Sequence, residues 1–291
     1  MARTVYVNSA YVDEGDAGVS VFDRGFLMAD GVYEVTGVLN GKLIEFPAHM
    51  ARLTRSLNAL DIKNPHTTDS WLEIHEELVR INAVENGLVY LQVTRGSFGD
   101  RDFAYLPNDV SPTVVLFTQR KRHPSQMLHV QSGIRVISMP DLRWGRRDLK
   151  TIQLLYPSMA KMEAIKRGAD DAWLVEDGFV TEGTASNAFI LKDKCLITRP
   201  RSERILHGVA RQTLLNVAED CGLTIDERPF TIAEAIAADE AFYTSSFVYV
   251  VPVIEIDSVP IGSGAPGAVT MKLHQAYLDL VSDTASAGQS T

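Results

Sequence analysis

The pattern of hydrophobic and polar residues along the chain predicts a mixture of strands and helices. Thr36 to Ile44 holds two apolar runs joined by Asn40-Gly41, residues that tolerate the positive φ of a primed turn, and it predicts a β-hairpin. Asp171 to Val180 repeats that pattern around Asp177-Gly178 and predicts a second hairpin. Apolar runs of strand length predict further strands at Leu88 to Thr94, Thr113 to Thr118, Glu240 to Ser245 and Val248 to Ile256.

Helical spacing of apolar residues predicts the remaining elements. After Pro47, which can open a helix, Met50, Leu53, Leu57 and Leu60 fall on one face. The other predicted helices are Asp69 to Glu85 with Asp69 as N-cap, Pro157 to Arg167 ended by Gly168, Gly208 to Asp220 ended at Gly222, and Gly267 to Val281.

The order of these elements predicts two domains. Residues 1–118 form a small α+β domain, and residues 132–281 form a larger domain of strands and helices. Residues 119–131 are polar and basic, so we interpret them as a solvated linker between the domains. The small polar residues at 282–291 predict a disordered tail.

Composition restricts the class of protein. The chain has 291 residues with 45% hydrophobic and 22% charged residues, which is typical of a soluble globular protein. Its net charge of −9 argues against a nucleic-acid partner. No run is apolar enough to predict a membrane span, and the N-terminus lacks an apolar signal core. Cys195 and Cys221 have no metal-binding spacing, which favours structural thiols and a cytoplasmic location.

Candidate chemistry begins at Lys150, in a segment from Asp148 to Gln153 whose pattern predicts a strand. An amphipathic helix is predicted after it, and the stretch Thr181 to Asn187 then combines Glu182 with small hydroxyl residues. A lysine that attacks a carbonyl must first lose its proton, and a nearby carboxylate can tune a bound ring. This pattern suggests Schiff-base chemistry, although a strand lysine that reaches solvent has the same sequence signature.

Several motifs occur in a fixed order along the chain. They are Asp23 to Gly25, Asp30 to Val35, His49 to Leu53, Gln92 to Gly96, Asp141 to Trp144, Asp148 to Thr151, Val180 to Asn187, Ile205 to Gln212 and Thr244 to Ser246. From roughly Tyr6 to Leu280 the chain thereby resembles the class IV, or fold-type IV, pyridoxal-phosphate aminotransferases, and within them the bacterial D-amino-acid aminotransferases.

The resemblance implies an α+β fold of two domains: a small N-terminal α+β domain and a larger, barrel-like mixed α/β domain, with the active site between them. It also implies pyridoxal 5'-phosphate as cofactor and a homodimer. Lys150 would form the Schiff base and carry protons, and Glu182 would pair with the pyridine nitrogen. The remaining cofactor contacts implied are Arg52, Val209, Ala210 and Ser246 for the phosphate and Leu206 for the ring face.

On the substrate side, the resemblance assigns Tyr33 to the α-carboxylate. The loop Ser97 to Phe103 departs from the family pattern, so Arg101 is the natural substitute for the family's arginine, and Asp102 or Phe103 stands where the family has a histidine. In relatives this loop reaches the neighbouring subunit's site. With the histidine donor lost, carboxylate binding would be looser and the substrate range would widen toward (R)-amines, which have no carboxylate. In the alternative interpretation, Arg101 is a loop arginine that pairs with Asp100 or Asp102 and does not bind substrate.

The leading hypothesis is ping-pong transamination between a D-amino acid, with (R)-primary amines as an addition, and an α-keto acid such as 2-oxoglutarate or pyruvate. One alternative is a lyase of the 4-amino-4-deoxychorismate type on the same fold. A branched-chain aminotransferase is another, which Gln153-Leu154 disfavours because those relatives carry Asn-Tyr there. A third is a protein that holds the cofactor without turnover.

Overall fold

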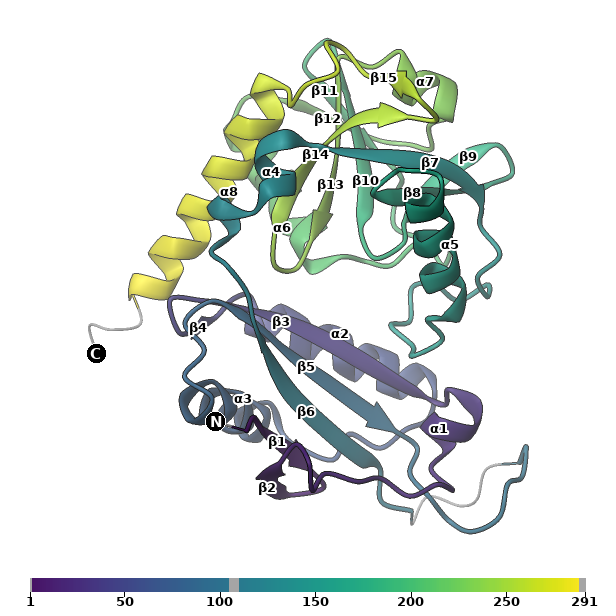
Figure 1. Ribbon diagram of the computed structural model, residues 1–291, viewed down its shortest axis with the longest axis vertical. Helices are drawn as coiled ribbons and strands as arrows, with labels where there is room; N and C mark the ends of the chain where they lie inside the picture. The colour runs from purple at the N-terminus through teal and green to yellow at the C-terminus, as the bar shows by residue number, and fades with distance from the viewer. Residues whose placement is uncertain (1, 105–109, 288–291) are drawn as a thin grey trace. The chain divides into compact units, whose positions relative to one another are not determined.

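The chain folds into two compact units in a computed structural model that describes residues 2–104 and 110–287 (Figure 1). The first unit extends to Arg122 and also includes Leu149–Gln153, and the second comprises His123–Asp148 and Leu154–Ala287. Both units mix strands and helices, as the sequence predicts. The loop that contains Arg101 extends over residues 97–106, and we call it the substrate loop. Its residues 105–106 and residues 288–291 of the predicted tail lie outside the described residues.

The first unit is built on an antiparallel sheet of six strands in the order β2-β1-β6-β5-β3-β4 (Figure 1). The turn between β3 and β4 has Asn40 at φ 50° and Gly41 at φ 75°, so the predicted hairpin is confirmed. The strands are β1 (Thr4–Val7), β2 (Ala10–Asp13), β3 (Gly31–Leu39), β4 (Lys42–Leu43), β5 (Gly87–Thr94) and β6 (Thr113–Arg120).

Helices α2 (Phe46–Ala59) and α3 (Thr68–Ile81) bury their apolar faces in the core of this unit, and α1 (Arg24–Met28) precedes β3. Met50, Leu53 and Leu57 are buried on α2 as their spacing predicts. The predicted N-cap of the next helix is wrong by two positions. Thr67 caps α3 instead, because its side chain accepts a hydrogen bond from the Ser70 amide.

The second unit contains a mixed sheet of nine strands in the order β12-β11-β10-β13-β14-β7-β8-β9, with β15 paired to β14. The predicted hairpin at Asp177-Gly178 is the turn between β8 and β9. The strands are β7 (Ile134–Pro140), β8 (Asp171–Glu176), β9 (Phe179–Gly183), β10 (Asn187–Lys192), β11 (Cys195–Thr198), β12 (Thr224–Glu227), β13 (Glu240–Ser245), β14 (Tyr249–Ile256) and β15 (Val259–Pro260).

Helices cover this sheet, with α8 lying along β14 and α5 against β8 (Figure 1). Gly168 and Gly222 follow α5 and α6 at φ 79° and 80°, the left-handed conformation expected after a helix. The helices are η1 (Pro124–Gln126), α4 (Leu128–Ser132), α5 (Leu155–Lys166), α6 (Val209–Asp220), α7 (Ile232–Ile236) and α8 (Ala268–Ala287).

Three predicted segments differ from the structure. The linker at 119–131 is largely structured, since β6 continues to Arg120 and η1 and α4 follow. The last helix continues past Val281 to Ala287, so the first part of the predicted tail is helical. Asp148 to Gln153 is not a strand, because only Thr151 forms a bridge, to Val32.

Candidate functional site

Lys150 is fixed by backbone contacts along β3. Its carbonyl accepts a hydrogen bond from the Tyr33 amide at 2.9 Å, and the amide of Ile152 donates to the Gly31 carbonyl at 3.1 Å. The Lys150 amide contacts the hydroxyl of Ser56 on α2 at 3.4 Å. The segment therefore extends the sheet by one short bridge, which orients a single side chain more firmly than a free loop would.

The amine of Lys150 lies above an aromatic ring. Its Nζ is 4.2 Å from the centroid of Tyr33, within the range of a cation–π contact. Tyr33 is stacked on Tyr90 with centroids 5.6 Å apart, and Tyr90 is stacked on Phe117 at 4.7 Å. This column of rings on β3, β5 and β6 fixes the Tyr33 ring, so Lys150 and Tyr33 form one preorganised pair.

Arg52 is buried on α2 rather than solvated. Its Nε and Nη2 donate to the two carboxylate oxygens of Glu34 on β3, at 2.8 and 2.7 Å. His49, one turn earlier, contacts the same carboxylate through Nδ1 at 2.8 Å. Burial raises the pKa of Glu34, but the Arg52 guanidinium outweighs it, so the net pKa is well below its usual range. An ionised Glu34 thus orients the Arg52 guanidinium.

Glu182 lies on β9 of the second unit and is almost fully buried. Its Oε1 accepts a hydrogen bond from Arg143. Its Oε2 accepts from the Asn187 side chain and from the Leu206 amide, both at 3.0 Å. Burial raises the pKa of Glu182, and the Arg143 guanidinium opposes that rise without cancelling it. The carboxylate is therefore rigidly held in an environment that resists its charge.

Arg143 is itself anchored by Asp141. The guanidinium donates Nε and Nη2 to the two oxygens of that carboxylate, at 2.9 and 2.6 Å. Asp141 also accepts from the hydroxyl of Thr181 at 2.6 Å and lies 3.5 Å from Nε of Arg147. The Asp-Leu-Arg-Trp motif, which follows β7, therefore delivers an arginine to Glu182 on β9, two strands away in the sheet order.

The start of α6 lies beside Glu182. Gly208 is its N-cap and offers no side chain to the backbone N–H groups of the first turn, where Val209 and Ala210 are buried. A Cβ on Gly208 would collide with Oδ1 of Asn187, so a larger residue there would have to displace the Asn187 side chain. Amides without a side-chain cap at the start of a helix of this length suit an anion.

Two buried hydroxyls near Asn187 have no hydrogen-bond partner among the described residues. They belong to Ser186, which precedes Asn187, and to Thr244, which pairs with Asn187 across β10 and β13. Ser246 lies two residues beyond Thr244 in the turn after β13 and is half-buried. A buried hydroxyl without a partner is costly, so these groups indicate that a polar ligand belongs here.

The candidate substrate arginine lies in an exposed loop. Arg101 stacks over the ring of Phe103, with Cζ 4.7 Å from the ring centroid. Within the described part of the chain it forms no ion pair with Asp100 or Asp102, so the salt-bridge interpretation of Arg101 finds no support.

The structure groups the predicted residues within each unit. Lys150, Tyr33 and Arg52 share β3 and its neighbours, whereas Glu182, Leu206 and the start of α6 share one cluster in the second unit. The sequence alone indicated no role for four residues, although each lies inside one of the ordered motifs: Arg143, Asn187, Glu34 and His49. Their place beside Glu182 or Arg52 within the same ordered motifs, or within a neighbouring one, was the available signal.

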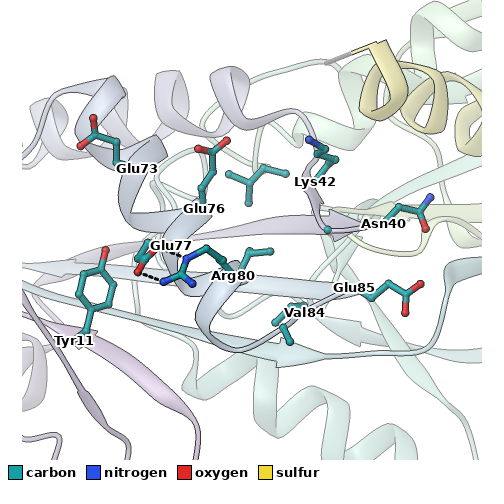
Figure 2. A pocket seen from close by; sticks show the side chains of 13 residues that line it. Tyr11, Asn40, Lys42, Glu73, Glu76, Glu77, Arg80, Val84 and Glu85 are labelled. Atoms are coloured by element: carbon teal, nitrogen blue, oxygen red, sulfur yellow. Dashed lines mark hydrogen bonds and ion pairs between the residues drawn. The ribbon is translucent and has the colours of Figure 1, made fainter. Parts of the chain in front are cut away.

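Other features carry no comparable chemistry. The cavity in Figure 2, about 920 Å³, has an acidic excess in its lining: Glu73, Glu76, Glu77 and Glu85 stand against Lys42 and Arg80, and Arg80 is already paired with Glu77. No group of three or more potential metal ligands occurs within residues 2–104 and 110–287. Over the same residues, no helix has the length and hydropathy to cross a membrane.

Comparisons with known proteins give consistent relatives. The family described as Amino-transferase class IV matches residues 31–256. A D-alanine aminotransferase of Bacillus licheniformis is 37% identical over 97% of this chain and 98% of its own length. One of Staphylococcus aureus (strain MSSA476) is 33% identical over 94% and 96%. The solved branched-chain aminotransferase of the archaeon Thermoproteus uzoniensis with norvaline is 26% identical, with a TM-score of 0.84 over 97% of this chain and 95% of that one.

Proposed function

The chain belongs to the class IV aminotransferases, which are pyridoxal-phosphate enzymes, and from this premise we propose that it transfers the amino group of a D-amino acid to an α-keto acid. The observation that carries the chemistry is the Lys150 amine held above Tyr33. The relatives named D-alanine aminotransferases support D-alanine as a donor. We propose 2-oxoglutarate as the acceptor for D-alanine, which becomes pyruvate, and pyruvate as the acceptor for other D-amino acids.

The residues of the second unit fit the cofactor. A carboxylate offers about four lone-pair sites, and Glu182 uses three of them for Arg143, Asn187 and the Leu206 amide. The remaining site suits the N–H of a pyridinium ring. The buried Thr244 hydroxyl without a partner and the uncapped start of α6 suit a phosphate.

In the first unit, Arg52 suits a phosphate. Glu34 holds the guanidinium by a bidentate pair, which fixes the plane of the five-donor fork before any ligand arrives. His49 adds a second contact to Glu34 and limits its rotation. Such a preformed cation binds an anion without losing side-chain entropy on binding.

Pyridoxal phosphate, when bound, supplies an aldehyde that takes up the amino group and a ring that accepts the electron pair released at Cα. The protein's part is to move protons and to hold charges. Nζ of Lys150 removes the proton from Cα of the amino donor and delivers a proton to Cα of the product in the reverse half-reaction. Tyr33 orients that amine, and Glu182 keeps a proton on the ring nitrogen.

Carboxylate recognition is proposed for Tyr33 and Arg101. Tyr33 lies beside Lys150. Arg101 is exposed in its loop, where its guanidinium is accessible to a substrate carboxylate. An arginine can hold a carboxylate by two parallel hydrogen bonds, which compensates for the missing histidine of the family pattern.

We propose a homodimer that buries the outer face of α5. Leu155, Met159 and Met162 lie on one face of this helix and are 76%, 57% and 60% exposed, with Ile165 beside them at 51%. The opposite face, with Ala160 and Ala164, packs in the core. A predicted amphipathic helix would expose polar residues, so this apolar surface supports a second copy as its cover.

The function is tested by half-reactions. Purified holoenzyme mixed with D-alanine or D-glutamate should lose its visible absorbance and yield the keto acid, whereas L-leucine should not react. Borohydride reduction followed by peptide mapping should label Lys150, and Lys150→Ala should abolish both reactions. Bleaching by L-leucine alone would favour the branched-chain alternative, to which the Thermoproteus uzoniensis structure is the relevant relative.

Arg101 is tested separately. Arg101→Ala should raise KM for D-glutamate about tenfold, the loss of roughly one charge-assisted hydrogen bond, with little effect on (R)-1-phenylethylamine, which has no carboxylate. Phe103→Ala, which removes only the stacking partner, is the matched control. Equal losses on both substrates would remove Arg101 from carboxylate binding.

A further inference from the structure

The Asp23-Arg24-Gly25 motif has no part in the proposed chemistry, yet its arginine is buried and forms several hydrogen bonds. Nη1 of Arg24 donates to the carbonyl of Asp102 at 2.6 Å and lies 3.5 Å from that of Ala104. Nη2 lies 3.5 Å from the carbonyl of Phe103. One side chain from before β3 thus contacts three consecutive backbone carbonyls of the substrate loop.

The position of Arg24 is fixed from the other side. Its Nε donates to Asp30 at 2.7 Å, and this ion pair compensates the burial of the guanidinium. Asp23 caps α1 through the Gly25 amide and accepts a hydrogen bond from Thr94 on β5. A Cβ on Gly25 would collide with the Thr94 side chain, so α1 lies directly on the sheet.

The held carbonyls follow Arg101 immediately in the chain. Arg101 has no ion pair within the described residues, and its one aromatic partner there, Phe103, has its carbonyl beside Arg24. The ring of Phe98, at the start of the loop, also lies 5.7 Å from Cζ of Arg24. The Arg24 guanidinium therefore contacts the loop on both sides of Arg101.

We propose that Arg24 is a positioning residue that holds the backbone of Asp102–Ala104 and so determines how Arg101 meets the substrate carboxylate. The inference rests on the proposed function, because it assigns Arg24 to the specificity of that reaction. Arginine is required because its planar fork presents five donors, which serve Asp30 and the loop carbonyls together. A lysine would keep the charge beside Asp30 but would reach only part of the loop.

The test separates loop order from catalysis. Hydrogen exchange of the holoenzyme is followed on peptides covering residues 97–104 in the wild type, Arg24→Lys and Arg24→Met. Arg80→Met, which removes an exposed arginine of α3 paired with Glu77, is the control. We expect exchange in this peptide to rise at least tenfold in Arg24→Met and less in Arg24→Lys, with no change in the control.

Kinetics on the same variants test the role in specificity. Because D-glutamate and 2-oxoglutarate both carry an α-carboxylate, KM for each should rise about tenfold in Arg24→Met, with kcat within about twofold and partial recovery in Arg24→Lys. The affinity for pyridoxal phosphate should not change. If Arg24→Met does not fold, Arg24→Lys alone decides both measurements.

Three results would overturn the inference, and the first two are unchanged loop exchange in both variants and increased exchange with unchanged KM. A fall in kcat and cofactor affinity without a KM effect would also overturn it, since a general loss of structure predicts that pattern. A wild-type enzyme without D-amino-acid activity overturns the proposed function and the specificity role with it, and the exchange measurement then decides whether Arg24 holds the loop.

Discussion

At the scale of single residues, the main feature of the second unit is the carboxylate of Glu182, whose ionised form is destabilised by burial. Desolvation raises the pKa of Glu182, and Arg143 provides the principal compensation. Asp141 in turn holds Arg143, and burial raises the pKa of Asp141 less than that arginine and its other partners lower it. The protonation of Glu182 is therefore determined by a chain of two charged neighbours.

We predict that Arg143→Met weakens cofactor binding. Without the guanidinium the pKa of Glu182 should rise further, and a neutral carboxyl cannot keep a proton on a ring nitrogen. Titration of the apoenzyme with pyridoxal phosphate should give a dissociation constant about tenfold higher, roughly the value of one charge-assisted hydrogen bond. Arg143→Lys should recover part of this affinity.

Arg135→Met, which removes an exposed arginine paired with Asp170, is the control for loss of a positive charge. It should leave the titration unchanged. An Arg143→Met enzyme with wild-type affinity and an unchanged visible spectrum would show that Glu182 does not depend on Arg143.

A second residue-scale prediction concerns Gly208. In Gly208→Ala the new Cβ must displace the Asn187 side chain, which donates to Glu182 and to the Leu206 carbonyl. Cofactor affinity should fall several-fold while the midpoint of thermal unfolding of the apoenzyme changes by only a few degrees, about 1 kcal/mol. Gly18→Ala, where a Cβ meets nothing, should change neither.

At the scale of elements, α3 contains a histidine that must stay neutral. His75 is fully buried, its Nδ1–H donates to the Trp71 carbonyl at 2.6 Å, and its ring lies edge-on to Phe46. Burial lowers the pKa of His75 to about 4 from an ordinary 6.5. Between these two values of pH, the imidazole of His75 is therefore protonated in the unfolded chain and neutral in the folded chain.

Stability should accordingly fall as the pH drops from about 6.5 to about 4, with His75 contributing at most about 3 kcal/mol of that loss. Above pH 6.5 both states are neutral at this position and the contribution is constant. Urea unfolding of His75→Gln should show a shallower pH dependence over this window. Val79→Ala on the same helix should lower stability equally at every pH, and an unchanged slope in His75→Gln would contradict the assignment.

At the scale of the whole molecule, the exposed face of α5 predicts an association state. Met159→Glu together with Met162→Glu places charges in the proposed interface and should convert the dimer to a monomer by light scattering. Lys166→Glu, at the end of the same helix, is the control for added negative charge. A wild-type monomer at micromolar concentration would contradict the proposed dimer.

Much of the fold could be predicted from local patterns. The turns at Asn40-Gly41 and Asp177-Gly178 have only one favourable backbone conformation, and both formed as expected. Lys150 and Glu182 were predicted from the order of the motifs that contain them. Their partners were not, because Arg143 and Glu182 lie on different elements and Arg24 meets its carbonyls far along the chain. The Lys150 segment was predicted as a strand, but it pairs with β3 through a single bridge only. No local sequence pattern reveals how far a segment pairs with a distant strand.

The placement of Lys150 has a consequence for anyone who divides this protein into fragments. Leu149–Gln153 belongs to the first unit although the residues before and after it belong to the second. A gene fragment that stops at Arg122 therefore encodes Tyr33 but not the amine that lies above its ring. If the two fragments are expressed as separate polypeptides, Lys150 lies on the second one. Covalent attachment of the cofactor to that second polypeptide would therefore show that the fragments had reassembled.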